Sequence, residues 1–278
     1  MSDALRPARL LLFAAVAAGG CAGDDAASTD ATTGATSSTT EASTSSSTTE
    51  ASSTTAETEE SSTTAETTGE PATVTIHGIA RVMPGSGKFV SQGDVCFVTP
   101  DQAVGPCTTT NSIGRFTLEG VPGDTHGAVT FAEDQIATFA WALRTAADDV
   151  ELSLAIDTPE LVQSYYDSAG VARIDGRVVV LTEVLPASAG YAATLDPTSG
   201  DGPFYYLTNA GELDPEATAS SDAVAMAVFL NVDPALAPFA APMRKDGAVC
   251  EGTDAGAPFT HSFVPDGADI LYFNRHCP

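Results

Sequence analysis

The sequence predicts an all-β protein: one or two small antiparallel β-sandwiches with one linking helix, preceded by a disordered Ser/Thr-rich linker. In the stretch 111–124, a turn, a strand of alternating apolar and polar residues, and a second turn follow one another. The spacing of Phe116, Leu118 and Pro122 in that stretch returns at 228–234, which indicates two related β units. One segment, 158–170, has nearly every signal of a helix.

The first residues have the order of a secretory signal. Arg6 and Arg9 precede a nine-residue uncharged run over 10–18, and two glycines and Cys21 follow. Nine apolar residues are too few to span a bilayer. The segment resembles a bacterial lipoprotein signal, which implies that 1–20 is removed and that Cys21 is lipidated. In that family, Ala22 in place of Asp implies the outer of two membranes. We therefore expect an exported, membrane-anchored lipoprotein at the outer membrane or cell surface; the alternative is an ordinary cleaved signal with an incidental cysteine.

Residues 21–71 are expected to form a disordered tether. From 24 to 70 the sequence has ten carboxylates but no aromatic residue, no Val, Ile or Leu and no basic residue. Such a segment cannot bury a core, and its recurring Ser-Thr-Thr units mark it as low-complexity sequence. As a random coil it would reach roughly 40 Å, and its charge would extend it further.

The charge balance excludes one class of partner. The chain has 37 acidic and 11 basic residues and a net charge of −26. Nucleic acid is not expected to bind, because phosphate recognition needs clustered cations and only Arg244 and Lys245 stand together. The sequence has no Gly-x-Ser-x-Gly elbow and no His-Glu-x-x-His pair, and its four histidines are scattered. We therefore expect no enzyme, no catalytic residue and no cofactor; a hydrolase with an unrecognised site is a distant alternative.

A first sandwich is expected over 72–157. Strands are predicted around 74–82, 95–98, 107–110, 115–119, 128–132, 136–143 and 150–156, although 136–143 could be helical on propensity alone. Cys96 and Cys107 then face each other across a hairpin. Because an exported chain favours oxidised cysteines, we expect a disulfide, which would stabilise the fold by roughly 3 kcal/mol in the chain-entropy model. Zinc is not expected, since the short paired spacings of zinc ligands are missing.

Two motifs in this unit carry a resemblance. Gly78-Ile79-Ala80-Arg81-Val82, followed by the ten residues from Gly114 to Gly123, resembles the carboxypeptidase-regulatory-like (transthyretin-like) β-sandwich family. The resemblance covers about eighty residues and implies a prealbumin-like sandwich. It implies no peptidase, because the family name refers to a non-catalytic accessory domain. The Gly-x-Pro-Val-x-Gly-Ala phrase usual after the first strand is absent, which leaves the register of the early strands open.

The linking helix and a second, divergent sandwich complete the chain. Thr158 suits the cap of a helix, Pro159 its first turn and Gly170 its end. The second sandwich is expected over 171–278, with strands near 173–181, 223–231 and 268–274. Cys250 and Cys277 lie within it, and we expect them to pair, because two separately closed sandwiches would rarely bring distant cysteines within about 7 Å.

Few residues suggest a ligand. Asp196, Ser199 and Asp201 could supply oxygens to calcium, but a turn explains them equally and their spacing is not that of the twelve-residue calcium loop. The aromatic candidates for a carbohydrate platform are Tyr205 and Tyr206, or Trp141, although strand aromatics usually belong to a core. The expected function is a non-catalytic, membrane-tethered surface lipoprotein that binds, adheres to or scaffolds an unknown protein or glycan. A carbohydrate-binding module is the alternative.

Overall fold

The computed structural model describes residues 72–83, 87–133, 136–207, 212–222, 224–250 and 256–277. The expected signal peptide, Cys21 and the tether lie outside these residues. The described part is mostly β, with one α-helix, as predicted. Among its residues no helix is long and apolar enough to cross a membrane.

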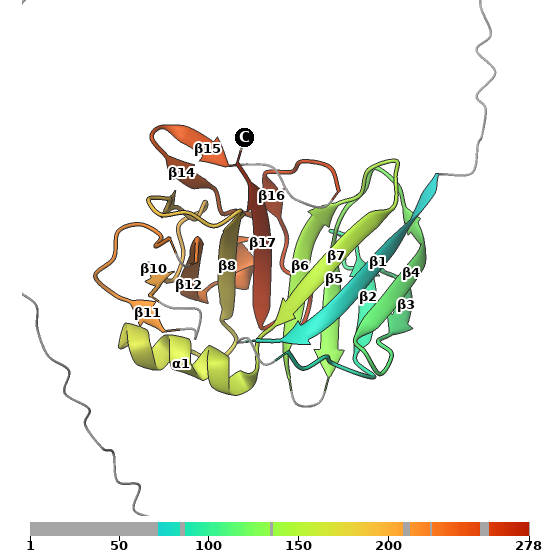
Figure 1. Ribbon diagram of the computed structural model, residues 1–278, viewed down its shortest axis with the longest axis horizontal. Helices are drawn as coiled ribbons and strands as arrows, with labels where there is room; N and C mark the ends of the chain where they lie inside the picture. Colours follow the sequence, from blue (N-terminus) through green and yellow to red (C-terminus); the bar gives the residue numbers. More distant parts are fainter. Residues whose placement is uncertain are drawn as a thin grey trace, which may run out of the picture. The chain divides into compact units, whose positions relative to one another are not determined.

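The first seven strands run without an intervening helix (Figure 1). They are β1 (Thr73–Val82), β2 (Asp94–Val98), β3 (Val104–Thr109), β4 (Arg115–Pro122), β5 (His126–Glu133), β6 (Ile136–Arg144) and β7 (Val150–Ile156). The helix α1 (Pro159–Ala169) follows, and β8 (Val178–Leu185) begins the second half. The remaining elements are β9 (Ala192–Ala193), β10 (Asp201–Tyr206), β11 (Leu213–Asp214), β12 (Met226–Val232), the short 3₁₀ helix η1 (Pro234–Leu236), β13 (Phe239–Ala240), β14 (Met243–Lys245), β15 (Ala248–Cys250), β16 (His261–Ser262) and β17 (Ile270–His276).

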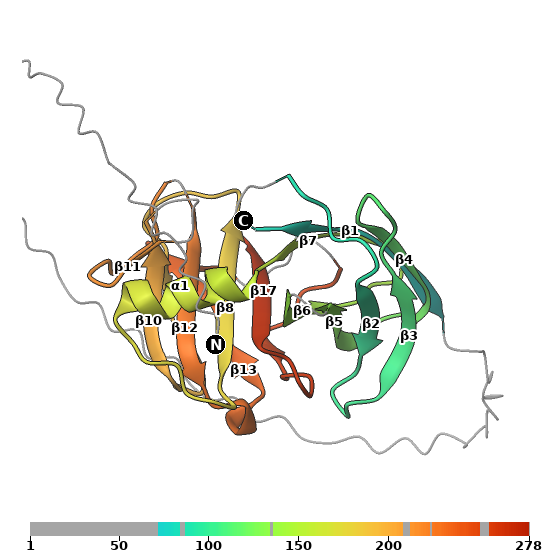
Figure 2. The same cartoon turned by 90° about the horizontal axis from the view of Figure 1, so that it is seen from below.

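Two sheets form the sandwich. The small sheet has the order β4-β1-β7, and the large one has nine strands in the order β11-β10-β12-β8-β17-β6-β5-β2-β3. Inward side chains of the small sheet, such as Ile76 and Leu118, share a buried core with Phe97, Phe131 and Phe139 of the large sheet. Figure 2 shows β1 and β7 lying over β5 and β6, which is the layering that this core fills.

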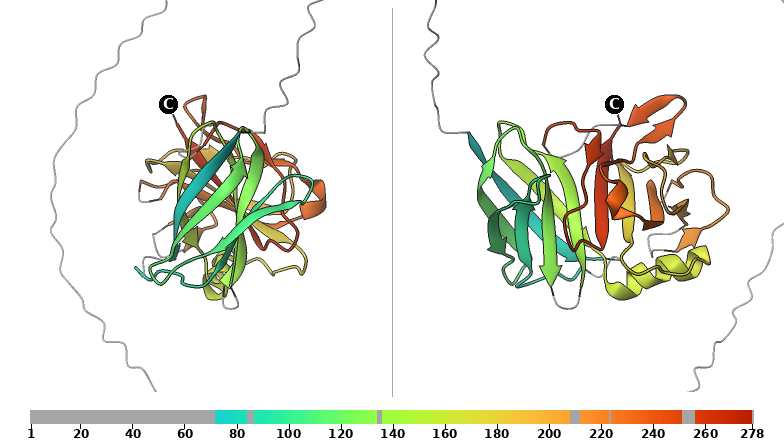
Figure 3. Two further views of the ribbon diagram at one scale, coloured as in Figure 1. Left: turned by 90° about the vertical axis from the view of Figure 1, so that its right-hand side faces the viewer. Right: turned by 180° about the vertical axis from the view of Figure 1, so that it is seen from behind.

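One strand joins the two halves of the chain. β17 pairs in parallel with β6 on one side and with β8 on the other, and it is visible between them in Figure 3 (right). Its Ile270 and Tyr272 face the core under the small sheet, whereas Leu271 and Phe273 face a second core on the opposite side. A strand buried on both faces reads as a continuous apolar run. The strands expected to form a second, separate sandwich therefore extend the sheet of the first.

The helix begins and ends at the predicted residues. The Thr158 side chain accepts a hydrogen bond from the Leu161 N–H, and Gly170 ends the helix in the left-handed region at φ 68°. Its face of Leu161, Val162 and Tyr165 packs into the core beside the second half of the large sheet (Figure 2).

Residues 136–143 lie in β6, as predicted, and pairing with β5 outweighs the helical alternative. Other local expectations differ from the structure. Strand β3 begins before the predicted 107–110 and includes Pro106, which is tolerated because β3 is the edge strand of the large sheet. Residues 173–177 are a loop, and β8 starts only at Val178. The two similar stretches also differ: β4 is buried on alternate residues at the edge of its sheet, whereas β12 is buried throughout.

Candidate ligand-binding face

The aromatic residues that suggested a carbohydrate platform are buried. Tyr205 is 2% exposed, Tyr206 7% and Trp141 5%. The Tyr205 hydroxyl accepts a 2.8 Å hydrogen bond from the Ala193 N–H. Trp141 packs on Tyr272 with 4.4 Å between ring centroids. None of the three presents a ring face to solvent, so this prediction of a platform is corrected: these side chains fill the core.

Tyr206 belongs to a buried hydrogen-bond network between the two halves of the protein. Its hydroxyl donates to the Tyr165 hydroxyl at 2.5 Å, and Tyr165 donates to Asp157 Oδ2 at 2.9 Å. Burial raises the pKa of Asp157 to about 7, and the hydrogen bond from Tyr165 opposes that rise. Burial also raises the pKa of both tyrosines well above the ordinary value. This hydrogen-bond network joins the end of β7, the helix and β10.

The calcium candidates do not gather into a site. Asp201 accepts a hydrogen bond from the Asn231 side chain at 2.9 Å, and Asp196 pairs through its backbone with Ala240. Within the described part of the chain, no group of three or more His, Cys, Asp or Glu side chains could hold a metal ion.

The four folded-region cysteines stand in two disulfides. Cys96 and Cys107 are opposite one another on β2 and β3, with 4.1 Å between their Cα atoms. Cys250 ends β15 and is joined to Cys277 after β17, with a Cα separation of 4.5 Å. The second bridge ties the end of the chain to a surface hairpin.

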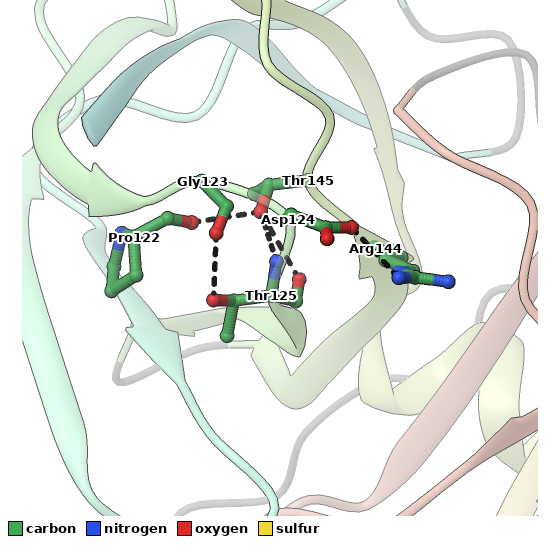
Figure 4. Close-up of polar contacts among 6 residues, drawn as sticks. All are labelled: Pro122, Gly123, Asp124, Thr125, Arg144 and Thr145. Carbon is green, nitrogen blue, oxygen red and sulfur yellow. Dashed lines mark hydrogen bonds and ion pairs between the residues drawn. The ribbon is translucent and has the colours of Figure 1, made fainter. Parts of the chain in front are cut away.

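The turn after β4 is fixed by its polar side chains (Figure 4). The buried Thr145 hydroxyl donates to the Pro122 carbonyl at 2.7 Å and accepts from the Thr125 N–H at 2.8 Å. Arg144 forms a 2.7 Å ion pair with Asp124. The Pro-Gly turn predicted from the sequence is thus held by hydrogen bonds to Thr145, the residue that follows β6.

Two of the histidines that are scattered in the sequence meet beside this turn. His126 and His261 line a recess of about 430 Å³ together with Arg144 and Phe259. Burial lowers the pKa of His126, and the nearby charges of Arg144 and His261 lower it further. His126 packs against Phe259 at 5.3 Å, and its Nε2 atom is buried without a hydrogen-bond partner among the described residues.

A cleft of about 800 Å³ lies where the loop before β8 meets the loops before β13 and β17. Its two arginines are tied to carboxylates: Arg173 lies 3.6 Å from Asp269, and Arg177 forms an ion pair with Asp233. The loop itself is held by Asn231, which is buried and has φ 54°. The Asn231 side chain accepts from the Ile174 N–H, and donates to the Ala172 carbonyl and to Asp201. The cations of this cleft therefore serve mainly to join loops.

The outer face of the small sheet is arranged differently. Alternation along β1 sends His77, Ile79 and Arg81 outward, while Ile76 and Ala80 point into the core. Pairing places Arg115 and Ser153 on either side of Ile79, and Thr117 and Glu151 on either side of His77. Phe89 and Ala155 lie on either side of Arg81. We call these three rows the outer face. Its residues are His77, Ile79, Arg81, Phe89, Arg115, Thr117, Glu151, Ser153 and Ala155.

Phe89 and the two arginines distinguish this face. Phe89 is 43% exposed and is the one exposed aromatic side chain in the part of the chain that the structure describes. The Arg81 guanidinium lies 5.6 Å from the centre of its ring, and the absence of a side chain at Gly114 leaves room for Phe89 beside Arg115. Neither Arg81 nor Arg115 forms an ion pair with a described acidic residue. The sequence did not indicate Phe89, because its pairing with Arg81 is a tertiary contact that no local pattern predicts.

Comparisons with known proteins leave the family open. No protein-family model and no curated protein matches the chain. Among solved structures, the Bacillus anthracis TIE protein aligns with 74% of this chain at 8% identity and a TM-score of 0.24; this chain spans a third of it, 33%. The shaft pilin SpaA from Lactobacillus rhamnosus GG aligns with 75% of this chain and 98% of its own, at 14% identity and a TM-score of 0.22. The minor pilin GBS52 from Streptococcus agalactiae aligns with 74% of this chain and 96% of its own, at 10% identity and a TM-score of 0.21. Similarity at this level says nothing of function.

Proposed function

We propose that this protein is a non-catalytic surface lipoprotein that binds a partner through the outer face of its small sheet. The observation that carries the proposal is the exposed Phe89, which lies beside Arg81 and Arg115. In contrast, Arg173 and Arg177 in the cleft are tied to carboxylates of other loops. Aromatic and arginine side chains are the residues that most often dominate binding surfaces. The two disulfides suit an exported chain.

The anchor and the tether are proposed from the sequence. The order of charged, apolar and small residues before Cys21 supports lipidation. A lipid anchor followed by an acidic segment would place the folded part outside the membrane surface. Replacing Cys21 by Ser should move the protein from the membrane fraction to the soluble fraction, and unchanged partitioning into detergent would contradict the anchor.

Adhesion of cells that display the full chain tests the binding function. Cells are layered on surfaces coated with purified cell-envelope material, and the retained fraction is compared with cells displaying Arg81→Gln/Arg115→Gln. The proposal expects retention by the original chain and its loss in the variant at equal display. Equal retention of the two would contradict it.

A carbohydrate-binding module is the second candidate. Phe89 favours it, because a sugar ring needs an exposed aromatic face and Phe89 supplies one. Phe89→Ala should then abolish binding to a glycan array that the original chain recognises.

A further inference from the structure

We propose that the outer face binds the carboxylate-bearing chain of an acidic polysaccharide. The proposal rests on the proposed function, which places this face outside the cell where such polymers occur, and it adds the chemical class of the ligand.

The cations are placed in register on the face. Arg115 is directly opposite Ile79, and Arg81 is two residues further along the same strand. Diagonal neighbours of this kind have Cβ atoms about 7–8 Å apart, within reach of long side chains. The two guanidinium groups can therefore approach one carboxylate from both sides, or two successive carboxylates of a polymer. Guanidinium groups match carboxylates with paired hydrogen bonds.

These two cations stand without an ion pair among the described residues of a mostly acidic chain. Between residues 72 and 278 the sequence holds 26 acidic and 9 basic residues. Elsewhere in the described part, Arg144, Arg173 and Arg177 each form an ion pair. Among the described residues, Arg81, Arg115 and Arg244 do not, although acidic partners are abundant, and of these three Arg81 and Arg115 stand together in register on one face. They are therefore available to an anion from outside.

The face also has an apolar component and a shallow trough. Ile79 and Phe89 stand next to the arginines, and the neighbouring strand presents the small side chains of Ser153 and Ala155 beside Ile79 and Arg81. Glu151 of that strand lies one row further along, beside His77. A depression of about 280 Å³ lies on this face, and its lining includes His77, Ile79, Arg81, Arg115, Thr117 and Glu151. A uronic acid ring has apolar C–H faces and a carboxylate at its edge. It can rest on Phe89 or Ile79 and direct its carboxylate to an arginine.

A polymer fits the face better than a small anion. Exposed charge pairs each contribute little, because water and salt screen them. Repeated carboxylates on one chain convert later contacts into intramolecular ones, which raises the overall affinity. Nucleic acid is disfavoured, since two arginines in an acidic fold do not provide the extended cationic track that a phosphate backbone requires.

The test measures binding of sodium polygalacturonate to the full chain in detergent by calorimetry. Pullulan of equal length is the uncharged control polymer. We expect polygalacturonate to bind and pullulan not to bind, with an affinity that falls as salt rises from 50 to 200 mM. Arg81→Gln/Arg115→Gln should lose about tenfold or more, corresponding to at least one charged hydrogen bond. Phe89→Ala should weaken binding without changing its salt dependence.

The matched control is Arg244→Gln, which removes an exposed arginine of β14 that likewise forms no ion pair among the described residues. It should bind as the original chain does, and thermal unfolding should show every variant to be folded. Equal binding of pullulan, or unchanged binding by the double variant, would overturn the proposal. Polygalacturonate that binds only after the acidic residues of 24–70 are replaced by amides would also overturn the proposal. That result would mean that the ligand of the outer face is the protein's own acidic segment. If polygalacturonate does not bind but the double variant still loses cell retention, the proposed function stands and only the polysaccharide ligand is rejected.

Discussion

The outer face and the cleft before β8 both carry two arginines, but they use them differently. In the cleft, Arg173 and Arg177 pair with carboxylates from other loops. On the outer face, Arg81 lies over an exposed phenylalanine ring and Arg115 stands opposite Ile79. The same residue type therefore holds the fold together in one place and is open to a partner in the other. By volume, the cleft is the better candidate for a binding site. The ion pairs of its arginines, and their absence at Arg81 and Arg115 among the described residues, favour the outer face instead.

The largest expected effect concerns Asp157, the buried carboxyl of the hydrogen-bond network with Tyr165 and Tyr206. Its pKa of about 7 in the folded chain is far above its ordinary value of 3.8, so the folded state binds a proton that the unfolded state has released. The stabilisation is therefore complete below about pH 4 and is lost as the pH rises to about 7, with a total on the order of 4 kcal/mol. Asp157→Asn should remove this decline.

We would measure this loss of stability by urea unfolding at pH 4.5 and pH 7.5. The Cys21→Ser chain is the parent, and the variant carries Asp157→Asn in addition. The variant should gain stability relative to the parent at the higher pH. A difference between variant and parent that is the same at both values would show that Asp157 is not protonated in the folded state.

Asn231 should give the next largest effect. Its buried side chain makes three hydrogen bonds that hold the loop carrying Arg173 and Arg177, and its φ of 54° disfavours most other residues. Asn231→Ala should lower the free energy of unfolding by about 3 kcal/mol, measured by urea unfolding. Ligand binding by the outer face should persist in the folded fraction. Loss of that binding at full folding would show that the two regions are coupled.

Asn111 is the matching asparagine beside the outer face, and its effect should be smaller. Its side chain accepts hydrogen bonds from the N–H groups of Ile113 and Arg115, both at 3.0 Å. Because Asn111 is exposed, water can replace these bonds, and Asn111→Ala should cost only about 1 kcal/mol. The same change should weaken ligand binding, since it loosens the start of β4 where Arg115 stands. A variant that loses stability but binds normally would show that the position of Arg115 does not depend on this turn.

The smallest effect is a shift of one titration. The hydrogen bond from Arg177, with that from the Ala235 N–H, lowers the pKa of Asp233. In Arg177→Gln the Asp233 pKa should therefore rise toward its ordinary value, which NMR titration of the carboxyl carbon can follow. An unchanged pKa would mean that the cleft arginine is not tied to Asp233 in solution.

Local sequence patterns predicted local structure well and long-range pairing poorly. The alternation of Phe116 and Leu118, the caps Thr158 and Gly170, and the hairpin of Cys96 and Cys107 depend on neighbours in the chain, and the structure has each of them. The position of β17 between β6 and β8 could not be read, because an apolar run does not identify its partner strands.

The candidate site illustrates the same limit. Tyr205 and Tyr206 stood beside a Gly/Pro-rich loop, and only burial shows that they belong to the core. Phe89 is an isolated aromatic residue in the sequence. Its significance comes from pairing with Arg81 and from packing against Gly114, contacts that join three separate segments.

The most direct test of the contrast compares two double variants, Arg81→Gln/Arg115→Gln on the outer face and Arg173→Gln/Arg177→Gln in the cleft. Both remove two positive charges, so any effect of net charge is the same. Retention of displaying cells on envelope-coated surfaces is measured at equal display. The face variant should lose retention while keeping its unfolding temperature, and the cleft variant should keep retention while unfolding at a lower temperature. Loss of retention in the cleft variant, with the face variant unaffected, would contradict the assignment of binding to the outer face.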